Sequence, residues 1–203
     1  MTAHEAHRLT APYAPLAQRI AAEATVIDDR ILKIDHFLNH RIEPAFMFAL
    51  GRELATRIAP FRPSLVLTAE ASGIAPGLTV AAALDLPLVY AKKYAPFVEL
   101  PAISRIVPSA TKGIDYRLVV ATRFLPPGAR VALVDDFLAN GRTAVALAEM
   151  VIEAGAELVV AGFLVEKLFQ TGRSGLARFD VPIATLAQVE ALRDGRVIIA
   201  GIA

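Results

Sequence analysis

The chain has 203 residues, 55% of them hydrophobic, and a formal net charge of +1. This length and apolar content fit one large folded domain over residues 1–203 and exclude a mainly disordered chain. A nearly balanced charge predicts neither a nucleic-acid surface nor an acidic-membrane surface, and the absence of Cys excludes disulfides and Cys-ligated zinc. No apolar stretch approaches the roughly 20 residues of a membrane span, and the N-terminus has no secretory pattern, so we expect a soluble cytoplasmic protein.

The N-terminal third predicts a tail and two helices. The first fifteen residues suggest a loose tail, and residues 16–24 a helix. Pro44 fits the first turn of a second helix, where its missing N–H has no partner in any case. Apolar residues then repeat at helical spacing up to the prolines that end the helix, namely Phe46, Leu50, Leu54 and Ile58 before Pro60 and Pro63.

From residue 65 onward, apolar runs alternate with helical patterns. The runs at 65–67, 88–90, 131–134 and 158–165 predict strands, and 74–84 and 141–154 predict helices. Continuous apolar runs between helices are typical of parallel strands that are covered on both faces. The sequence therefore predicts the α/β class, with a parallel central sheet flanked by helices.

Polar residues follow each predicted strand. Ligands of open parallel sheets bind outside the carboxyl ends of the strands, so these residues are the candidate site. In chain order they are Glu70, Ser72 and Gly73, then Lys92 and Lys93, then Asp135 and Asp136 with Ala139, Asn140, Gly141, Arg142 and Thr143, and finally Lys167.

The sharpest signal is the segment 131–143, in which four apolar residues precede Asp135, Asp136 and a short turn before a helix. Backbone N–H groups of a turn and a first helical turn can converge on a phosphate, which the helix dipole favours. Gly141 permits close backbone approach and Thr143 adds a hydroxyl donor. Paired carboxylates suit vicinal hydroxyls, so the segment predicts a site for a ribose 5-phosphate. Alternatively, the two Asp only cap the helix.

This segment resembles the diphosphoribosyl-binding signature of the type I phosphoribosyltransferases. The resemblance implies their fold, and it implies that residues 139–143 hold the 5′-phosphate while the acidic pair, Asp135 and Asp136, holds the ribose hydroxyls and acts in catalysis. The family more often has Thr-Gly-Gly-Thr where this chain has Asn140-Gly141-Arg142-Thr143. The branch that it resembles most usually has Gln-Ala in place of Arg142 and Thr143.

The remaining loops agree with this resemblance. It implies that Glu70, Ser72 and Gly73 belong to a loop that binds diphosphate, which Lys92 or Lys93 neutralises. It also implies that the Pro-bounded segment 94–121 is a mobile loop covering the site. Mg²⁺ is the expected cofactor, bound mainly through the substrate 5-phospho-α-D-ribose 1-diphosphate (PRPP).

Two further segments, 31–44 and 165–173, are similar to the xanthine-specific branch of the family. By that resemblance Leu32 and Asn39 line the purine pocket and Lys167 contacts the base. Residues 1–43 would form a tail and a hood over the site, and 60–180 the core. The resemblance implies purine salvage, with transfer of the phosphoribosyl group to xanthine by a homodimer.

Several alternatives stay open. Guanine, hypoxanthine, adenine or orotate could be the acceptor, and a non-catalytic regulator that senses PRPP is a rival class. Either Asp135 or Asp136 could take the purine proton. Asn39 could instead be a turn residue that bonds its own backbone. His36 and His40 are four residues apart, a spacing that could bind a metal on a helix, but the segment offers no third ligand.

Overall fold

The computed structural model describes residues 3–93, 101–108 and 115–202. Its helices are α1 (Ala3–Thr10), α2 (Ala14–Glu23), α3 (Pro44–Ile58), α4 (Ile74–Leu84), α5 (Arg142–Glu153) and α6 (Gly172–Leu176). Its strands are β1 (Thr25–Ile27), β2 (Ile31–Lys33), β3 (Leu65–Ala69), β4 (Leu88–Lys93), β5 (Ala102–Val107), β6 (Tyr116–Ala121), β7 (Arg130–Leu138), β8 (Glu157–Lys167), β9 (Ile183–Arg193) and β10 (Arg196–Ile199).

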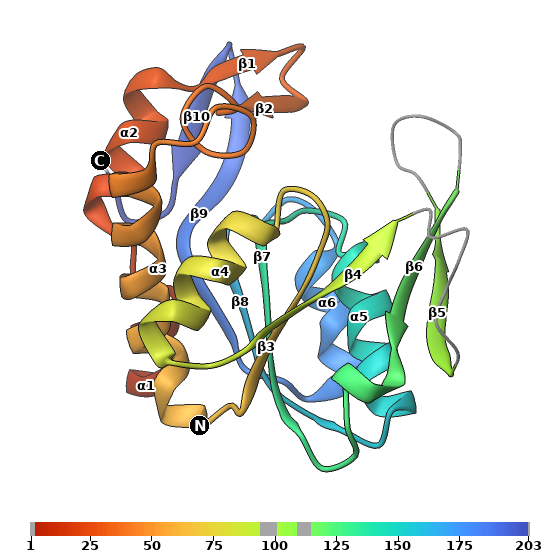
Figure 1. Ribbon diagram of the computed structural model, residues 1–203. Coiled ribbons are helices and arrows are strands. Elements are labelled where there is room, and N and C mark those ends of the chain that lie inside the picture. The colour runs from red at the N-terminus through yellow and green to blue at the C-terminus, as the bar shows by residue number, and fades with distance from the viewer. Residues whose placement is uncertain (1–2, 94–100, 109–114, 203) are drawn as a thin grey trace.

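The centre of the molecule is an eight-stranded sheet in the order β10-β9-β8-β7-β3-β4-β6-β5 (Figure 1). Strands β9, β8, β7, β3 and β4 run parallel to one another, whereas β10, β6 and β5 are added antiparallel at the edges. The predicted α/β class with a parallel sheet is confirmed. The antiparallel edges were not predicted, because their residues do not form continuous apolar runs.

Helices cover both faces of this sheet. Helices α3 and α4 pack on one face, where Leu50, Leu54 and Ile58 of α3 are fully buried, and α5 and α6 pack on the other (Figure 1). Both faces of the central strands are therefore apolar, which explains the uninterrupted apolar runs. The predicted helices 74–84 and 141–154 are found as α4 and α5.

The N-terminus differs from the expected loose tail, because residues Ala3–Thr10 form α1, which lies against β9. The Arg57 guanidinium of α3 donates to the carbonyl oxygens of Leu9 (3.3 Å) and Ala11 (2.8 Å). Tyr13 N also donates to Leu186 O at 2.7 Å. Backbone groups of the first residues are thus bound by a side chain and a strand distant in the sequence, which sequence periodicity does not reveal.

The hood segment lies beside β10, the strand at one edge of the sheet. Strands β1 and β2 form a small antiparallel hairpin near β10 (Figure 1). The Asp29 carboxylate of its turn accepts N–H groups from Asp194 (3.2 Å) and Gly195 (2.9 Å), in the turn between β9 and β10. The loop of residues 34–43, called the hood loop below, follows this hairpin and leads to α3. None of the helices in the described part of the chain has the length and hydropathy of a membrane span.

The segment expected as one long covering loop, 94–121, contains two strands in its described part. Strands β5 and β6 pair antiparallel, from Ala102 opposite Ala121 to Val107 opposite Tyr116, and β6 joins the sheet through β4. Residues 94–100 and 109–114 lie outside the described residues, so the expected mobility of the segment stays a prediction.

Candidate active site

A pocket of about 160 Å³ lies where β3, β4 and β7 end, as expected for a parallel sheet. It brings together predicted residues from strands β4 and β7 and from the loops after β3 and β7. Those lining it are Glu70, Ser72, Lys93, Asp135, Asp136, Ala139, Asn140, Gly141, Arg142 and Thr143, with Ala69, Phe137 and Ala144. Three chain segments that are far apart in sequence therefore share one cavity.

The acidic pair sits inside β7 rather than after it. The strand continues to Leu138, with Phe137 opposite Val165 and Leu138 opposite Glu166 of β8. Asp135 and Asp136 are accordingly only 8% and 6% exposed. These carboxylates are not solvated groups at a strand end, because β7 stays paired with β8 beyond them and Asn39 of the hood loop bonds Asp136.

The two carboxylates have different surroundings. Asp136 accepts hydrogen bonds from Asn39 Nδ2 (2.8 Å), Ser72 Oγ (3.1 Å) and Phe137 N (3.0 Å). Asp135 Oδ1 accepts from Asp136 N at 2.9 Å. Burial, followed by the charge of Asp136, raises the pKa of Asp135 well above its ordinary value. Asp135 therefore binds a proton more readily than an ordinary carboxylate does.

The loop of residues 139–143, called the phosphate loop below, is held by close backbone packing. Gly141 has φ +79°, and a Cβ built on it would lie 2.7 Å from the Cα of Gly172 in α6. Gly172 N donates to Ala139 O at 2.9 Å. Helix α5 begins at Arg142, and the N–H groups of a first helical turn have no partner within the helix. The Arg142 N–H donates to Asn140 Oδ1 at 3.1 Å, so only the other backbone donors of the loop and first turn can serve an anion beside the acidic pair.

The other predicted residues differ in whether they face the pocket, because successive side chains of a strand point to opposite faces of the sheet. Lys93 lines the pocket, whereas Lys92 points from the other face of β4 and is exposed. The Glu70 carboxylate accepts the backbone N–H of Lys93 and so fixes the end of β4. Gly73 is buried, and a Cβ there would lie 2.5 Å from Asp135 Oδ1, so only Gly fits beneath the acidic pair.

Asn39 and Lys167, which were expected to contact a base, do not line this pocket themselves, but each contacts a residue that does: Asn39 bonds Asp136, and Lys167 lies over Phe137. Lys167 Nζ lies 5.4 Å from the centre of the Phe137 ring, and burial lowers the pKa of Lys167. Leu32 is 7% exposed and belongs to the apolar core beneath the hood rather than to the pocket lining. The Asn39 amide bonds Asp136, 97 positions away, instead of its own backbone, which removes the turn-residue alternative.

Comparison with known proteins identifies the family. A scan of protein-family models gives no match. Over 193 residues the chain is 58% identical to the xanthine phosphoribosyltransferase of Chloroflexus aurantiacus, covering 95% of this chain and 92% of that protein. It is 42% identical to the protein of that name from Heliobacterium modesticaldum, over 91% of this chain and 98% of that protein. The chain belongs to the xanthine phosphoribosyltransferase family.

Solved structures agree with this assignment. The adenine phosphoribosyltransferase of Thermoanaerobacter pseudethanolicus is 28% identical and matches with a TM-score of 0.63 over 71% of this chain and 81% of that chain. The adenine phosphoribosyltransferase of Trypanosoma brucei matches with a TM-score of 0.73 over 86% of this chain and 79% of that chain, at 19% identity, which shows the fold alone. The predicted resemblance to the type I phosphoribosyltransferases is confirmed.

Two residues at the pocket of this phosphoribosyltransferase were not predicted. Phe137 lines the pocket, and Lys167 lies over its ring. Its position directly after the acidic pair is a sequence signal that could have identified it. Tyr116 of β6 lies with its hydroxyl 2.8 Å from Thr143 Oγ1 and its ring centre 4.7 Å from Lys93 Nζ. No motif marks Tyr116, because its contacts depend on how the edge strands fold back over the phosphate loop.

Proposed function

We propose that the protein transfers the 5-phosphoribosyl group from PRPP to xanthine, giving xanthosine 5′-phosphate and diphosphate. The observation that carries the proposal is the convergence of the acidic pair, the phosphate loop and the Glu70 loop in one pocket. Relatives that are named for this reaction match nearly the whole chain.

PRPP would occupy the pocket along its length. The phosphate loop would receive the 5′-phosphate through its backbone N–H groups and the Thr143 hydroxyl. The acidic pair would accept the ribose hydroxyls. Lys93 and the backbone around Ser72 and Gly73 would receive the diphosphate, since Lys93 is the cation of β4 that lines the pocket. Lys92 would have no direct part in binding, because it lies on the other face of the strand.

The chemistry requires stabilisation of two opposite charges. As diphosphate leaves, the ribose ring becomes positive, and the pre-positioned carboxylates beside it lower the energy of that state. Three hydrogen-bond donors fix the position of the Asp136 carboxyl group. Asp135, whose pKa burial raises, is the better acceptor for the purine proton. The proposed roles are therefore charge stabilisation for Asp136 and proton uptake for Asp135.

Mg²⁺ fits this donor set only as a substrate-bound ion. The described residues contain no group of three or more His, Asp or Glu side chains placed to hold a metal. The carboxylates of Glu70 and Asp136 already accept protein hydrogen bonds. Mg²⁺ commonly takes few protein ligands and several phosphate oxygens, so PRPP would supply most of its ligands. Bound there, it would neutralise the charge of the departing diphosphate.

Turnover assays test this function. Xanthine with PRPP and Mg²⁺ should release diphosphate, and kcat/KM for xanthine should exceed the values for hypoxanthine, guanine, adenine and orotate. A preference for another base would mean that the proposed acceptor is wrong but that the proposed phosphoribosyl transfer still holds. Failure to release diphosphate with every base, while PRPP still binds, would favour the regulatory alternative.

We also propose that the protein works as a cytoplasmic homodimer, as the family resemblance implies. The chain mass is 21.7 kDa. Sedimentation at micromolar concentration should therefore give about twice this mass, and a species of a single chain mass would contradict the dimer.

A further inference from the structure

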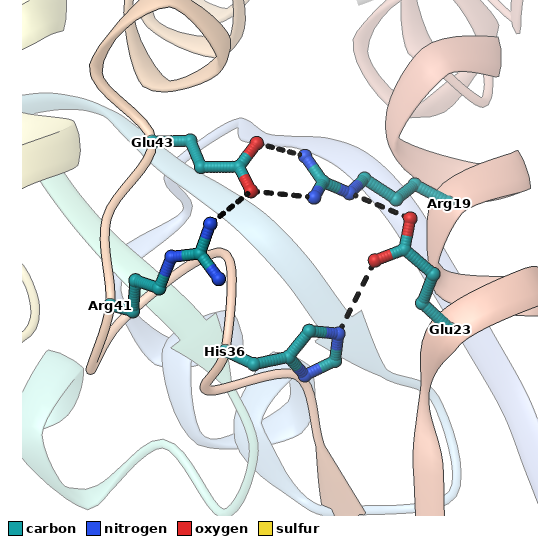
Figure 2. Close-up of polar contacts among 5 residues, drawn as sticks. All are labelled: Arg19, Glu23, His36, Arg41 and Glu43. Atoms are coloured by element: carbon teal, nitrogen blue, oxygen red, sulfur yellow. Dashed lines mark hydrogen bonds and ion pairs between the residues drawn. The ribbon is translucent and has the colours of Figure 1, made fainter.

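The side chain of Arg19 in helix α2 contacts the hood loop through several groups (Figure 2). Its guanidinium donates twice to Glu43, from Nη1 to Oε2 at 2.7 Å and from Nη2 to Oε1 at 2.9 Å. Its Nε donates to Glu23 Oε1 at 3.1 Å. Glu43 is the last residue of the hood loop, so the start of α3 is tied to α2 by a two-bond fork, the strongest form of this ion pair.

The same guanidinium also packs against the rings that form the base of the hood loop. Its Cζ lies 4.4 Å from the centre of the Phe37 ring and 4.9 Å from that of Phe46. Phe37 is 1% exposed, and the Arg19 side chain is 21% exposed. Partial burial makes these cation–π contacts stronger than exposed ones.

The other end of the hood loop is attached to the same helix. His36 Nε2 lies 3.3 Å from Glu23 Oε2, and Glu23 also accepts from Arg19 (Figure 2). Within the loop, the Asp35 carbonyl oxygen accepts the N–H groups of His40 (3.1 Å) and Arg41 (2.9 Å). Residues near both ends of the hood loop therefore contact α2, and its central turn is closed by bonds within the loop.

Asn39 stands in the middle of this loop and reaches the acidic pair. Its Nδ2 donates to Asp136 Oδ2 at 2.8 Å, and its neighbour Leu38 is 1% exposed. An amide group carries two N–H donors, so one remains after the bond to Asp136. The direction of that second donor depends on where the loop holds the Asn39 backbone.

We propose that Arg19, which does not reach the pocket, is a positioning residue for base selection. It fixes the hood loop so that Asn39 stays on Asp136 and aims its remaining N–H at the 2-oxo group of the purine. This inference rests on the proposed function, because it concerns the preference for xanthine over hypoxanthine, which lacks the 2-oxo group. Only an Arg supplies both the planar fork to Glu43 and the stacking on Phe37, so Lys would not replace it.

The test compares Arg19→Lys with Arg130→Lys. Arg130 begins β7 at the opposite end of the sheet, and it likewise bonds a carboxylate, Glu157 (2.5 Å), and two carbonyl oxygens, of Phe61 (2.9 Å) and Arg62 (3.0 Å). Arg130→Lys therefore removes a comparable network without touching the hood loop. The measured quantities are kcat/KM for xanthine and for hypoxanthine, KM for PRPP, and amide hydrogen exchange at His40 and Arg41.

Arg19→Lys should lower the xanthine-to-hypoxanthine ratio of kcat/KM about tenfold, the scale of one lost hydrogen bond. KM for PRPP should stay within about twofold, since the phosphate loop is untouched. Exchange at His40 and Arg41 should become faster. In the Asn39→Ala background the same substitution should change the ratio no further, because the effect passes through Asn39. Arg130→Lys should leave the ratio unchanged even if it lowers Tm.

A wild-type protein that turns over no purine would overturn the proposed function itself. A wild-type protein that prefers xanthine, with the same ratio in Arg19→Lys, would overturn only the role of Arg19. A ratio that falls equally in the Asn39→Ala background would also overturn it, because Arg19 would then act by a route other than Asn39.

Discussion

Gly141 of the phosphate loop and Gly172 of α6 are packed backbone against backbone. A Cβ on Gly141 would lie 2.7 Å from Gly172 Cα, and a Cβ on Gly172 would lie 2.6 Å from Ala139 O. Neither position has room for a side chain. The phosphate loop is therefore supported from behind by α6, and its shape depends on a residue more than thirty positions further along the chain.

Gly141→Ala should damage this support. The new methyl group collides with backbone rather than with a movable side chain, and φ +79° is strained for Ala, so we expect a loss of roughly 1–3 kcal/mol in stability. The displaced loop should raise KM for PRPP more than KM for xanthine. Gly128→Ala is the matched control, because Gly128 has φ +77° with nothing within 4 Å of its Cβ position. Equal effects of both variants on KM for PRPP would contradict the packing argument.

The acidic pair predicts opposite stability effects for two similar substitutions. Asp135→Asn removes a buried charge whose pKa is raised by burial and by Asp136, so stability at neutral pH should increase. Asp136→Asn replaces an oxygen that accepts from Asn39 by an amide that donates, so its Tm should be lower than that of Asp135→Asn. Both variants should lose at least tenfold in kcat/KM, about 1.4 kcal/mol.

The gain from Asp135→Asn should depend on pH. A raised pKa means that the native state holds this proton more tightly than the unfolded chain. The corresponding stability is complete below about pH 4, the unfolded pKa of Asp, and is lost as the pH rises through the native pKa. Asp135→Asn has no proton to lose at this position, so its stability does not fall in this way as the pH rises. Its Tm relative to wild type should therefore increase between about pH 4 and pH 8, and a constant difference would show that Asp135 titrates normally.

The local parts of the site were predictable from the sequence. The acidic pair and residues 139–143 lie within one short segment, where a strand, a turn and a helix follow directly, so residue order alone brings them together. The burial of Asp135 was not predictable, because two carboxylates after four apolar residues indicate the end of a strand. The strand continues because β8 pairs with it through Leu138.

Contacts between segments that are distant in the sequence were not predicted. Lys92 and Lys93 are chemically identical, and only the phase of β4 decides that Lys93 faces the pocket. Tyr116 comes from a segment expected as a loop and reaches Thr143 because β6 pairs with β4. Both depend on sheet register, which is set by long-range pairing.

Base selection gives a further prediction, in which Asn39→Ala and Lys167→Ala should differ. Asn39→Ala removes the proposed donor for the 2-oxo group, so the preference for xanthine over hypoxanthine should fall about ten- to a hundredfold, as for a polar contact worth roughly 1–3 kcal/mol. Lys167→Ala should weaken xanthine, hypoxanthine and guanine together, because all three share the 6-oxo group. Competition assays with these bases measure both effects, and an unchanged ratio in Asn39→Ala would remove Asn39 from the base pocket.

The bond between Tyr116 and Thr143 should support PRPP binding from the edge of the sheet. The Tyr116 hydroxyl lies 2.8 Å from Thr143 Oγ1, so it can fix the orientation of the hydroxyl that we propose binds the 5′-phosphate. Tyr116→Phe keeps the ring beside Lys93 and removes this bond. A loss of about 1 kcal/mol should raise KM for PRPP about fivefold and leave KM for xanthine nearly unchanged.

A double-mutant cycle separates this effect from general loss of stability. In the Thr143→Val background, Tyr116→Phe should raise KM for PRPP no further, because the bond is already absent. Tyr90→Phe is the matched control, since Tyr90 lies on the adjacent strand β4 and is exposed. Independent effects of Tyr116→Phe and Thr143→Val would mean that the hydroxyl acts elsewhere. Coupled effects, with Tyr90→Phe silent, would place Tyr116 among the residues that position the phosphate loop.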